Sequence, residues 1–129
     1  MANRNTYDHL LLLKDAGAVS ADGAGTVATV ARVLDMGAAD FMAKAVVDSS
    51  ALDTTSTDET YRVLIQGSNV AAMSSGVVTL GATDVTVNGR SEVYFSNRSG
   101  DTVYRYVRIF FDVGGTTPSI NATAFLAKV

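Results

Sequence analysis

The chain has 129 residues, of which 47% are hydrophobic and 18% are charged. A disordered chain is poor in hydrophobic residues and rich in charge, so this composition indicates one folded domain. Ten basic and 13 acidic residues leave a net charge of −3 without a basic cluster. Because nucleic-acid binding needs a basic face, we expect no nucleic-acid partner. Cysteine is absent, which excludes disulfides, thiol catalysis and cysteine-based zinc sites.

The first 25 residues contain a short apolar run, four leucines at residues 10–13, followed by Lys14. A signal peptide needs an apolar stretch of roughly 7–15 residues, and a membrane span needs roughly 20. We therefore expect a protein that is not exported by that route and does not enter a membrane. Two interpretations of the leucines stay open: a first core strand, or part of an arm that contacts another protein.

β-branched residues dominate the remainder, with 17 valines, 14 threonines and three isoleucines. Their stiff side chains fit a pleated strand better than a helix. Eleven glycines and one proline lie among short apolar runs. Many short strands with glycine-rich turns are typical of a sandwich or barrel, so we expect an all-β, single-domain protein of about eight antiparallel strands.

Residues 26–48 fit this pattern least well. The apolar residues from Val27 to Leu34 have helical spacing, but Gly37 interrupts it and no convincing cap follows. Strands are therefore favoured over a helix there. In chain order, we expect strands over residues 30–36, 41–48, 60–66, 77–82, 84–87, 91–96, 102–113 and 120–128.

The stretch over residues 102–113 is the clearest of these strands. Alternate residues from Val103 to Val113 are apolar except for Arg105, whereas the residues between them are aromatic or charged. This period of two predicts one buried and one amphipathic face. Two glycines end the strand, and the loop before residue 120 predicts a hairpin of medium length.

No group of residues points to catalysis. The single histidine, His9, has no serine and carboxylate placed to form a triad with it. The sequence GAG at residues 23–25 lacks the third glycine of a nucleotide-binding loop and indicates a turn. Four carboxylates over residues 48–59 could bind calcium, but EF-hand spacing is absent and a solvated loop is favoured. We expect no enzyme activity, no cofactor and no metal; the glycosylation sequons at Asn97 and Asn121 lack a supporting export signal.

Aromatic and arginine side chains gather between residues 94 and 111. The aromatics could stack on bases or sugars, but packing in the core or between subunits is favoured because aromatic burial is large. Arg105 and Arg108 lie in an apolar strand, so each needs a partner or an interface. Glu92 is a plausible cross-strand partner, and a contact between subunits is the alternative.

The order of several motifs resembles a known family. The sequences GRSEVYFSN at residues 89–97, YRYVRIFFDVGGT at 104–116 and INATAFLAK at 120–128 are similar to the end of jelly-roll cement (decoration) proteins of tailed-bacteriophage capsids. Upstream, VLDMG at residues 33–37 and YRVLIQGS at 61–68 fit the same pattern.

The resemblance implies an eight-stranded jelly-roll β-sandwich over residues 26–129, with residues 1–25 as an arm and first strand. It implies a structural virion protein, a homotrimer made in the bacterial cytoplasm that binds the major capsid protein outside the head and clamps neighbouring subunits. Carbohydrate binding by a jelly-roll module on a virion or cell surface is the alternative. Candidate contacts with the shell or between subunits are Arg4, Tyr7, Leu10, Leu12, Arg105 and Arg108.

Overall fold

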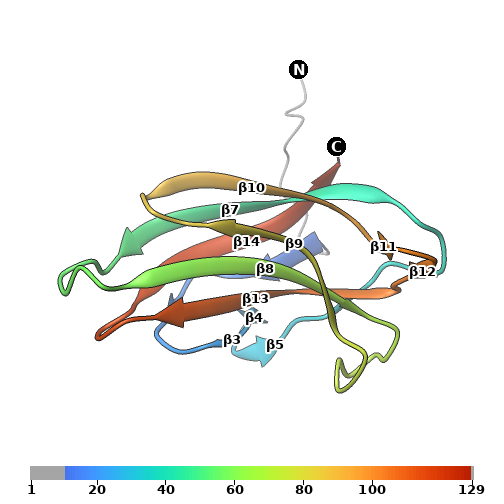
Figure 1. Ribbon diagram of the computed structural model, residues 1–129, viewed down its shortest axis with the longest axis horizontal. Helices are drawn as coiled ribbons and strands as arrows, with labels where there is room; N and C mark the ends of the chain where they lie inside the picture. Colours follow the sequence, from blue (N-terminus) through green and yellow to red (C-terminus); the bar gives the residue numbers. More distant parts are fainter. Residues whose placement is uncertain (1–10, 129) are drawn as a thin grey trace.

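The computed structural model describes residues 11–128, which form two antiparallel β-sheets packed face to face (Figure 1). The first sheet contains β1 (Leu12–Lys14), β2 (Ala18–Val19), β7 (Met42–Leu52), β10 (Gly89–Ser96) and β14 (Ile120–Lys128). The second contains β3 (Gly23–Ala24), β6 (Leu34–Asp35), β8 (Thr60–Ser68), β9 (Val78–Asp84) and β13 (Tyr106–Gly114). Two small hairpins complete the fold: β4 (Thr26–Val27) with β5 (Val30–Ala31), and β11 (Arg98–Ser99) with β12 (Thr102–Val103).

The strand order follows a simple rule. The first sheet has the order β1-β14-β7-β10, and the second has the order β3-β13-β8-β9. Each early strand pairs antiparallel with a late one: β1 with β14, β3 with β13, β7 with β10 and β8 with β9. The chain is thus arranged as one long two-stranded ribbon that is folded over into two layers.

The all-β sandwich predicted from composition is confirmed, and the residues described contain no α-helix. Residues 26–48 form strands, as favoured over the helix. The predicted period of two is also present, because Val107, Ile109 and Phe111 are fully buried between the layers. Ala45 and Val47 on β7 meet them from the opposite sheet within the same core.

The strand predicted over residues 102–113 is wrong in one respect, because it is broken at residues 104 and 105. The amide of Tyr104 donates to the carbonyl of Asn97, and the amide of Arg105 donates to the side chain of Asn69. Two asparagines therefore take the place of a neighbouring strand. Asn97 closes the β11–β12 hairpin, while β13 continues as a separate strand from Tyr106.

The predicted hairpin between β13 and β14 is also wrong, because the two strands belong to different sheets. β14 buries Ile120 and Leu126 in the core from the side opposite β13. The connecting loop crosses between layers and is held there by the amide of Ser119, which donates to the hydroxyl of Tyr61 at 2.9 Å. A glycine-rich loop permits either connection, so the sequence pattern cannot distinguish them.

Two predicted strand ranges also change. Residues 77–87 hold one strand, β9, instead of two, because Thr83 continues the pairing with Val63. Residues 30–36 hold two short strands instead of one. β5 pairs with β4 in a hairpin, and the chain then crosses to the second sheet, where β6 pairs with β13. The boundaries of β14 match the prediction.

The GAG sequence contributes its first two residues, Gly23 and Ala24, to strand β3 and does not form the predicted turn. Its last residue, Gly25, lies where the first strand crosses the second sheet. A Cβ atom on Gly25 would be 2.3 Å from Cγ2 of Ile109 and 2.7 Å from the carbonyl oxygen of Leu13. Only glycine allows the two layers to approach this closely at that point.

The β4–β5 hairpin is strained at its turn. Ala28 and Thr29 have φ angles of 52° and 66°, the left-handed region in which a Cβ atom is unfavourable. Glycine removes that cost at the second turn position. We expect Thr29→Gly to raise the free energy of unfolding by about 1 kcal/mol, as measured by urea titration. The same change at Thr86, an exposed residue without a left-handed φ, is expected to lower it.

Candidate interaction surfaces

No group of three or more histidine, cysteine, aspartate or glutamate residues between 11 and 128 could hold a metal ion. His9 lies outside the described residues. Within the same part of the chain, no helix is long and apolar enough to cross a membrane.

Of the four carboxylates predicted to lie in a solvated loop, Asp48 lies in β7, which continues to Leu52, and the other three lie in the loop that follows and accept hydrogen bonds there. Asp53 accepts hydrogen bonds from the hydroxyl and the amide of Thr55, and these bonds keep the pKa of the Asp53 carboxyl below its ordinary value of 3.8. The hydroxyl and amide of Thr116 lower the pKa of Asp58 in the same way, at 2.7 and 3.1 Å. The other two acidic residues also have partners: Asp48 binds Arg90, and Glu59 accepts from Thr117.

These contacts predict an acid-sensitive fold. The pKa values of Asp35, Asp53, Asp58 and Glu92 are all lowered, chiefly by hydrogen bonds from Arg105, Thr55, Thr116 and Lys44 respectively. The folded chain therefore binds fewer protons than the unfolded chain around these pKa values. Stability should be constant from neutral pH to about pH 5.5 and should fall below about pH 4, as the carboxylates become protonated.

Urea midpoints measured across this pH range test the prediction. Asp58→Asn should flatten the acid decline. Asp101→Asn should not, because Asp101 has no hydrogen bond or ion pair in the described structure. If Asp58→Asn leaves the decline of stability with falling pH as steep as Asp101→Asn does, the assignment of that decline to Asp58 is contradicted.

The two arginines singled out from the sequence have different partners from the one expected. Arg105 forms a bidentate ion pair with Asp35, in which its Nε and Nη2 donate to the two carboxylate oxygens at 2.7 and 2.9 Å. Arg108 donates from Nε to the side-chain oxygen of Gln66 at 2.8 Å. Glu92 is not their partner, because it lies on β10 in the other sheet, where Lys44 binds it at 3.0 Å.

The candidate contacts near the N-terminus are only partly described. Arg4, Tyr7 and Leu10 lie outside the described residues. Leu12 is 3% exposed and packs with Val46 and Phe125 in a small hydrophobic cluster separate from the main core. Leu12 and Leu13 are both buried in β1, as expected if the leucine run is a first core strand.

Lys14 is a buried cation that sequence reasoning did not single out. Its Nζ donates to the carbonyls of Asp15 and Gly17, at 2.8 and 2.9 Å, and lies 5.9 Å from the centre of the Phe111 ring. Burial lowers the pKa of the ammonium group below its ordinary value of 10.5. The residue fastens the turn after β1 to the edge of the sandwich, a role for which the sequence contains no pattern.

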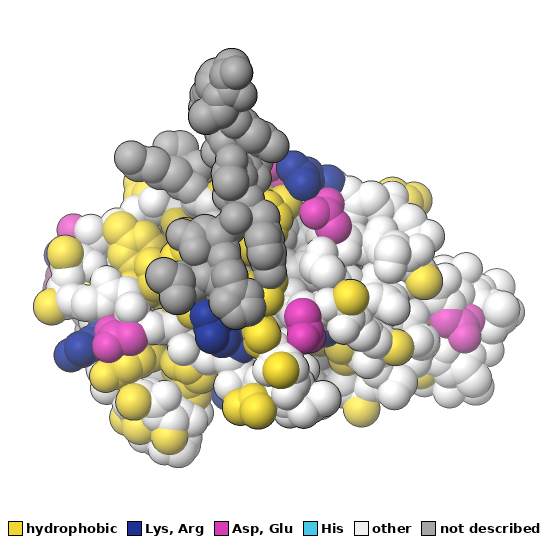
Figure 2. Space-filling view, turned by 180° about the vertical axis from the view of Figure 1, so that it is seen from behind, with side chains coloured by type: hydrophobic (Ala, Val, Ile, Leu, Met, Phe, Trp, Pro, Cys, Tyr) yellow, Lys and Arg dark blue, Asp and Glu magenta, His cyan; other side chains and the backbone are white. Residues whose placement is uncertain are grey.

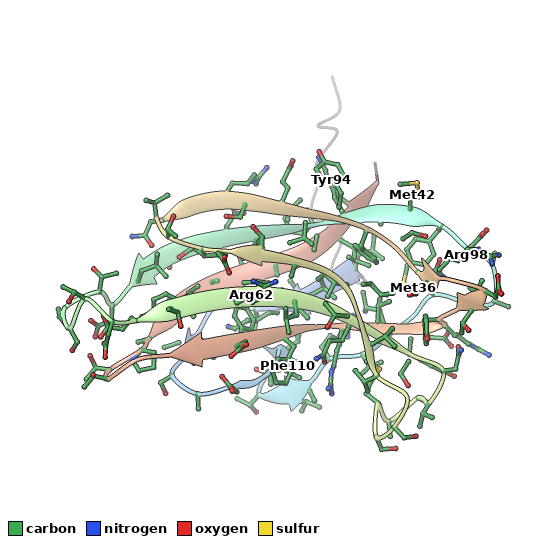
Figure 3. The ribbon with its side chains drawn as sticks, in the orientation of Figure 1. Met36, Met42, Arg62, Tyr94, Arg98 and Phe110 are labelled. Atoms are coloured by element: carbon green, nitrogen blue, oxygen red, sulfur yellow. The ribbon has the colours of Figure 1, made fainter. Side chains whose placement is uncertain are left out.

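The aromatic side chains do not form a single platform. Phe95 and Phe111 are buried in the core, where Phe95 meets Phe41 edge to face at 6.1 Å. Tyr94 projects from the outer face of the first sheet, whereas Phe110 lies on the outer face of the second (Figure 3). Tyr94 and Phe95 therefore lie on opposite faces of their strand, and so do Phe110 and Phe111, as the period of two requires.

Asn97 is a fully buried polar residue that the sequence marked only as a glycosylation sequon. Its side-chain oxygen accepts from the amide of Phe41 at 2.8 Å. Its side-chain nitrogen donates to the carbonyls of Ala39 and Tyr104, both at 3.1 Å. Asn97 thus joins the segment before β7 to the segment before β13, and its burial leaves no room for a glycan.

The outer face of the first sheet carries closed ion pairs. Lys44 binds Glu92, and Arg90 binds Asp48, each pair joining β7 to β10. From behind, hydrophobic side chains are dispersed among acidic and basic ones (Figure 2). A groove of about 480 Å³ lies at one end of the sandwich, lined by Leu11, Met36, Ala39, Asp40, Phe41, Met42, Ala43, Leu126 and Ala127.

Comparison with known proteins does not add a relative to these observations. No protein-family model matches the sequence, and a search of curated proteins finds no match.

Proposed function

We propose that this chain is a capsid cement (decoration) protein that binds the outside of a bacteriophage head and stabilises contacts between major capsid protein subunits. The strand order carries the proposal. An early strand pairs with a late strand four times, in sheets ordered β1-β14-β7-β10 and β3-β13-β8-β9. This order supports a jelly roll, the fold implied by the resemblance of motif order.

A protein that clamps neighbouring subunits needs a body that keeps its shape under load. The buried core supplies most of that stiffness, because surface ion pairs contribute only about 0–1 kcal/mol each. The pairs instead help to hold strand register. Arg90 with Asp48 joins β10 to β7, and Arg62 with Asp84 joins β8 to β9.

The contact with the shell is assigned to the N-terminal arm. Arg4, Tyr7 and Leu10 precede Leu11, which lines the 480 Å³ groove. An arm that starts beside an apolar groove can bring both polar and apolar side chains into contact with a neighbouring capsid subunit. Leu12 is removed from the contact residues because it is buried. The homotrimer would multiply weak contacts through effective concentration.

Co-sedimentation with heads assembled without this chain tests the proposal. The full chain should pellet with the heads at a saturating ratio, and an unrelated β-sandwich of similar charge should not. Deletion of residues 1–8 should weaken binding by at least about tenfold, or 1.4 kcal/mol. Absence of binding by the full chain would contradict the function, whereas equal binding by both chains would contradict only the arm.

A further inference from the structure

The outer face of the second sheet carries an apolar row that crosses four strands. The strand register places Ala24, Phe110, Leu64 and Ala82 side by side, on β3, β13, β8 and β9. All four are half-buried, whereas Ile109, the chain neighbour of Phe110, is fully buried in the core. The row therefore faces away from the core.

On each flank of this row β13 carries one charged side chain, and these two are of opposite sign and form no ion pair. The Arg62–Asp84 ion pair, on β8 and β9, lies on the same flank as Asp112. Arg108 lies two residues before Phe110, 5.7 Å from its ring centre, and its bond to Gln66 involves no carboxylate. Asp112 lies two residues after Phe110 and is exposed, and its carboxylate has no hydrogen bond or ion pair among the described residues; Arg62, opposite it on β8, binds Asp84. On the outer face of the first sheet, Lys44 and Arg90 are each paired with a carboxylate on the neighbouring strand.

A two-fold axis would bring these flanks together. If the axis lies along the apolar row, each row residue meets its own counterpart, and β13 runs antiparallel to β13 of the other copy. Arg108 then faces Asp112 of the second copy, and Asp112 faces its Arg108. The other flank residues are also chemically compatible, because Gln66 would face Arg62 of the second copy and Thr79 would face its Asp84.

We propose that the outer face of the second sheet binds the same face of a second copy of this chain, about a two-fold axis along the Ala24–Phe110–Leu64–Ala82 row. Such an interface is self-complementary, which is the requirement of a two-fold contact. It has an aromatic side chain, Phe110, at its centre and an arginine, Arg108, on its flank, and both residue types are enriched at interfaces. The contact goes beyond the proposed function because it joins two copies of the chain through residues other than those proposed to bind the shell.

Charge exchange between the flanks tests this contact. Arg108→Asp leaves carboxylates on both flanks, and Asp112→Arg leaves arginines on both. Analytical ultracentrifugation from micromolar to millimolar concentration should show that each single variant self-associates at least about tenfold more weakly than the parent chain. An equimolar mixture of the two variants, and the double variant Arg108→Asp/Asp112→Arg, should both recover association.

The parent chain should double its mass with concentration, from one chain to two or from three to six. Exchange of charge on the other sheet, in Arg90→Asp/Asp48→Arg, is the matched control and should leave the association unchanged. Three results would each overturn the proposal: a parent chain that never doubles, single variants that associate like the parent, or a mixture that stays dissociated. Because the proposed contact is assigned to residues of β3, β13, β8 and β9, binding to heads is scored separately.

Discussion

Replacing Asn97 by alanine is expected to lower the free energy of unfolding by about 3–5 kcal/mol. The change removes three side-chain hydrogen bonds and leaves the amide of Phe41 and the carbonyls of Ala39 and Tyr104 without their buried partner. A backbone group that loses its partner costs about 1–3 kcal/mol where water cannot replace the bond; Phe41 and Tyr104 are half-buried, whereas the exposed Ala39 can be hydrated. Since small domains are stable by only about 5–15 kcal/mol, the effect should be plain in a urea titration followed by circular dichroism.

Two further variants locate the effect at the side chain of Asn97. Asn97→Asp keeps the acceptor for Phe41 but loses both donors and buries a charge, so it should be no more stable than the alanine variant. Thr86→Ala, at an exposed residue whose side chain has no hydrogen bond among the described residues, should change stability by less than about 0.5 kcal/mol. A similar loss at both positions would contradict the role assigned to Asn97.

Phe95→Ala is expected to cost about 3–5 kcal/mol, the usual range for removing a buried aromatic ring. Phe95 is 4% exposed and loses its edge-to-face contact with Phe41. Its neighbour Tyr94 is 57% exposed on the opposite face of the same strand. Tyr94→Ala removes only surface contacts with Lys44 and Glu92, so it should cost less than about 1 kcal/mol.

This pair of variants measures the register of β10 directly. A shift of one residue would exchange the buried and exposed positions along the whole strand. Equal losses for the two variants, or a larger loss for Tyr94→Ala, would contradict the arrangement of the first sheet. Near-ultraviolet circular dichroism at low temperature confirms that each variant is folded before it is titrated.

Sequence pattern predicted the strands whose faces differ strongly in polarity. On β13, Val107, Ile109 and Phe111 alternate with polar or aromatic residues, so the period of two is visible without a structure. The same pattern cannot show which strands pair. The loop after Val113 is compatible with a hairpin, and only the packing of Ile120 and Leu126 from the other side of the core makes it a crossing between sheets.

The sites that sequence reasoning missed depend on contacts between distant residues. Asn97 reads as a sequon until its partners, 56 and 58 residues away, are known. Arg105 pairs with Asp35 across 70 residues, and no local pattern selects Asp35 over Glu92. The apolar row has the same origin, because Phe110 and Leu64 become neighbours only through the register of β13 with β8.

Electron cryo-microscopy of heads incubated with this chain tests the central claim most directly. The proposal predicts density of two stacked sheets on the outer surface, seated where major capsid protein subunits meet, with residues 1–10 directed at the shell. It also predicts that heads without the chain lack that density. Bare heads at saturating concentrations of the folded chain, or density confined to the inner surface, would contradict the proposed function.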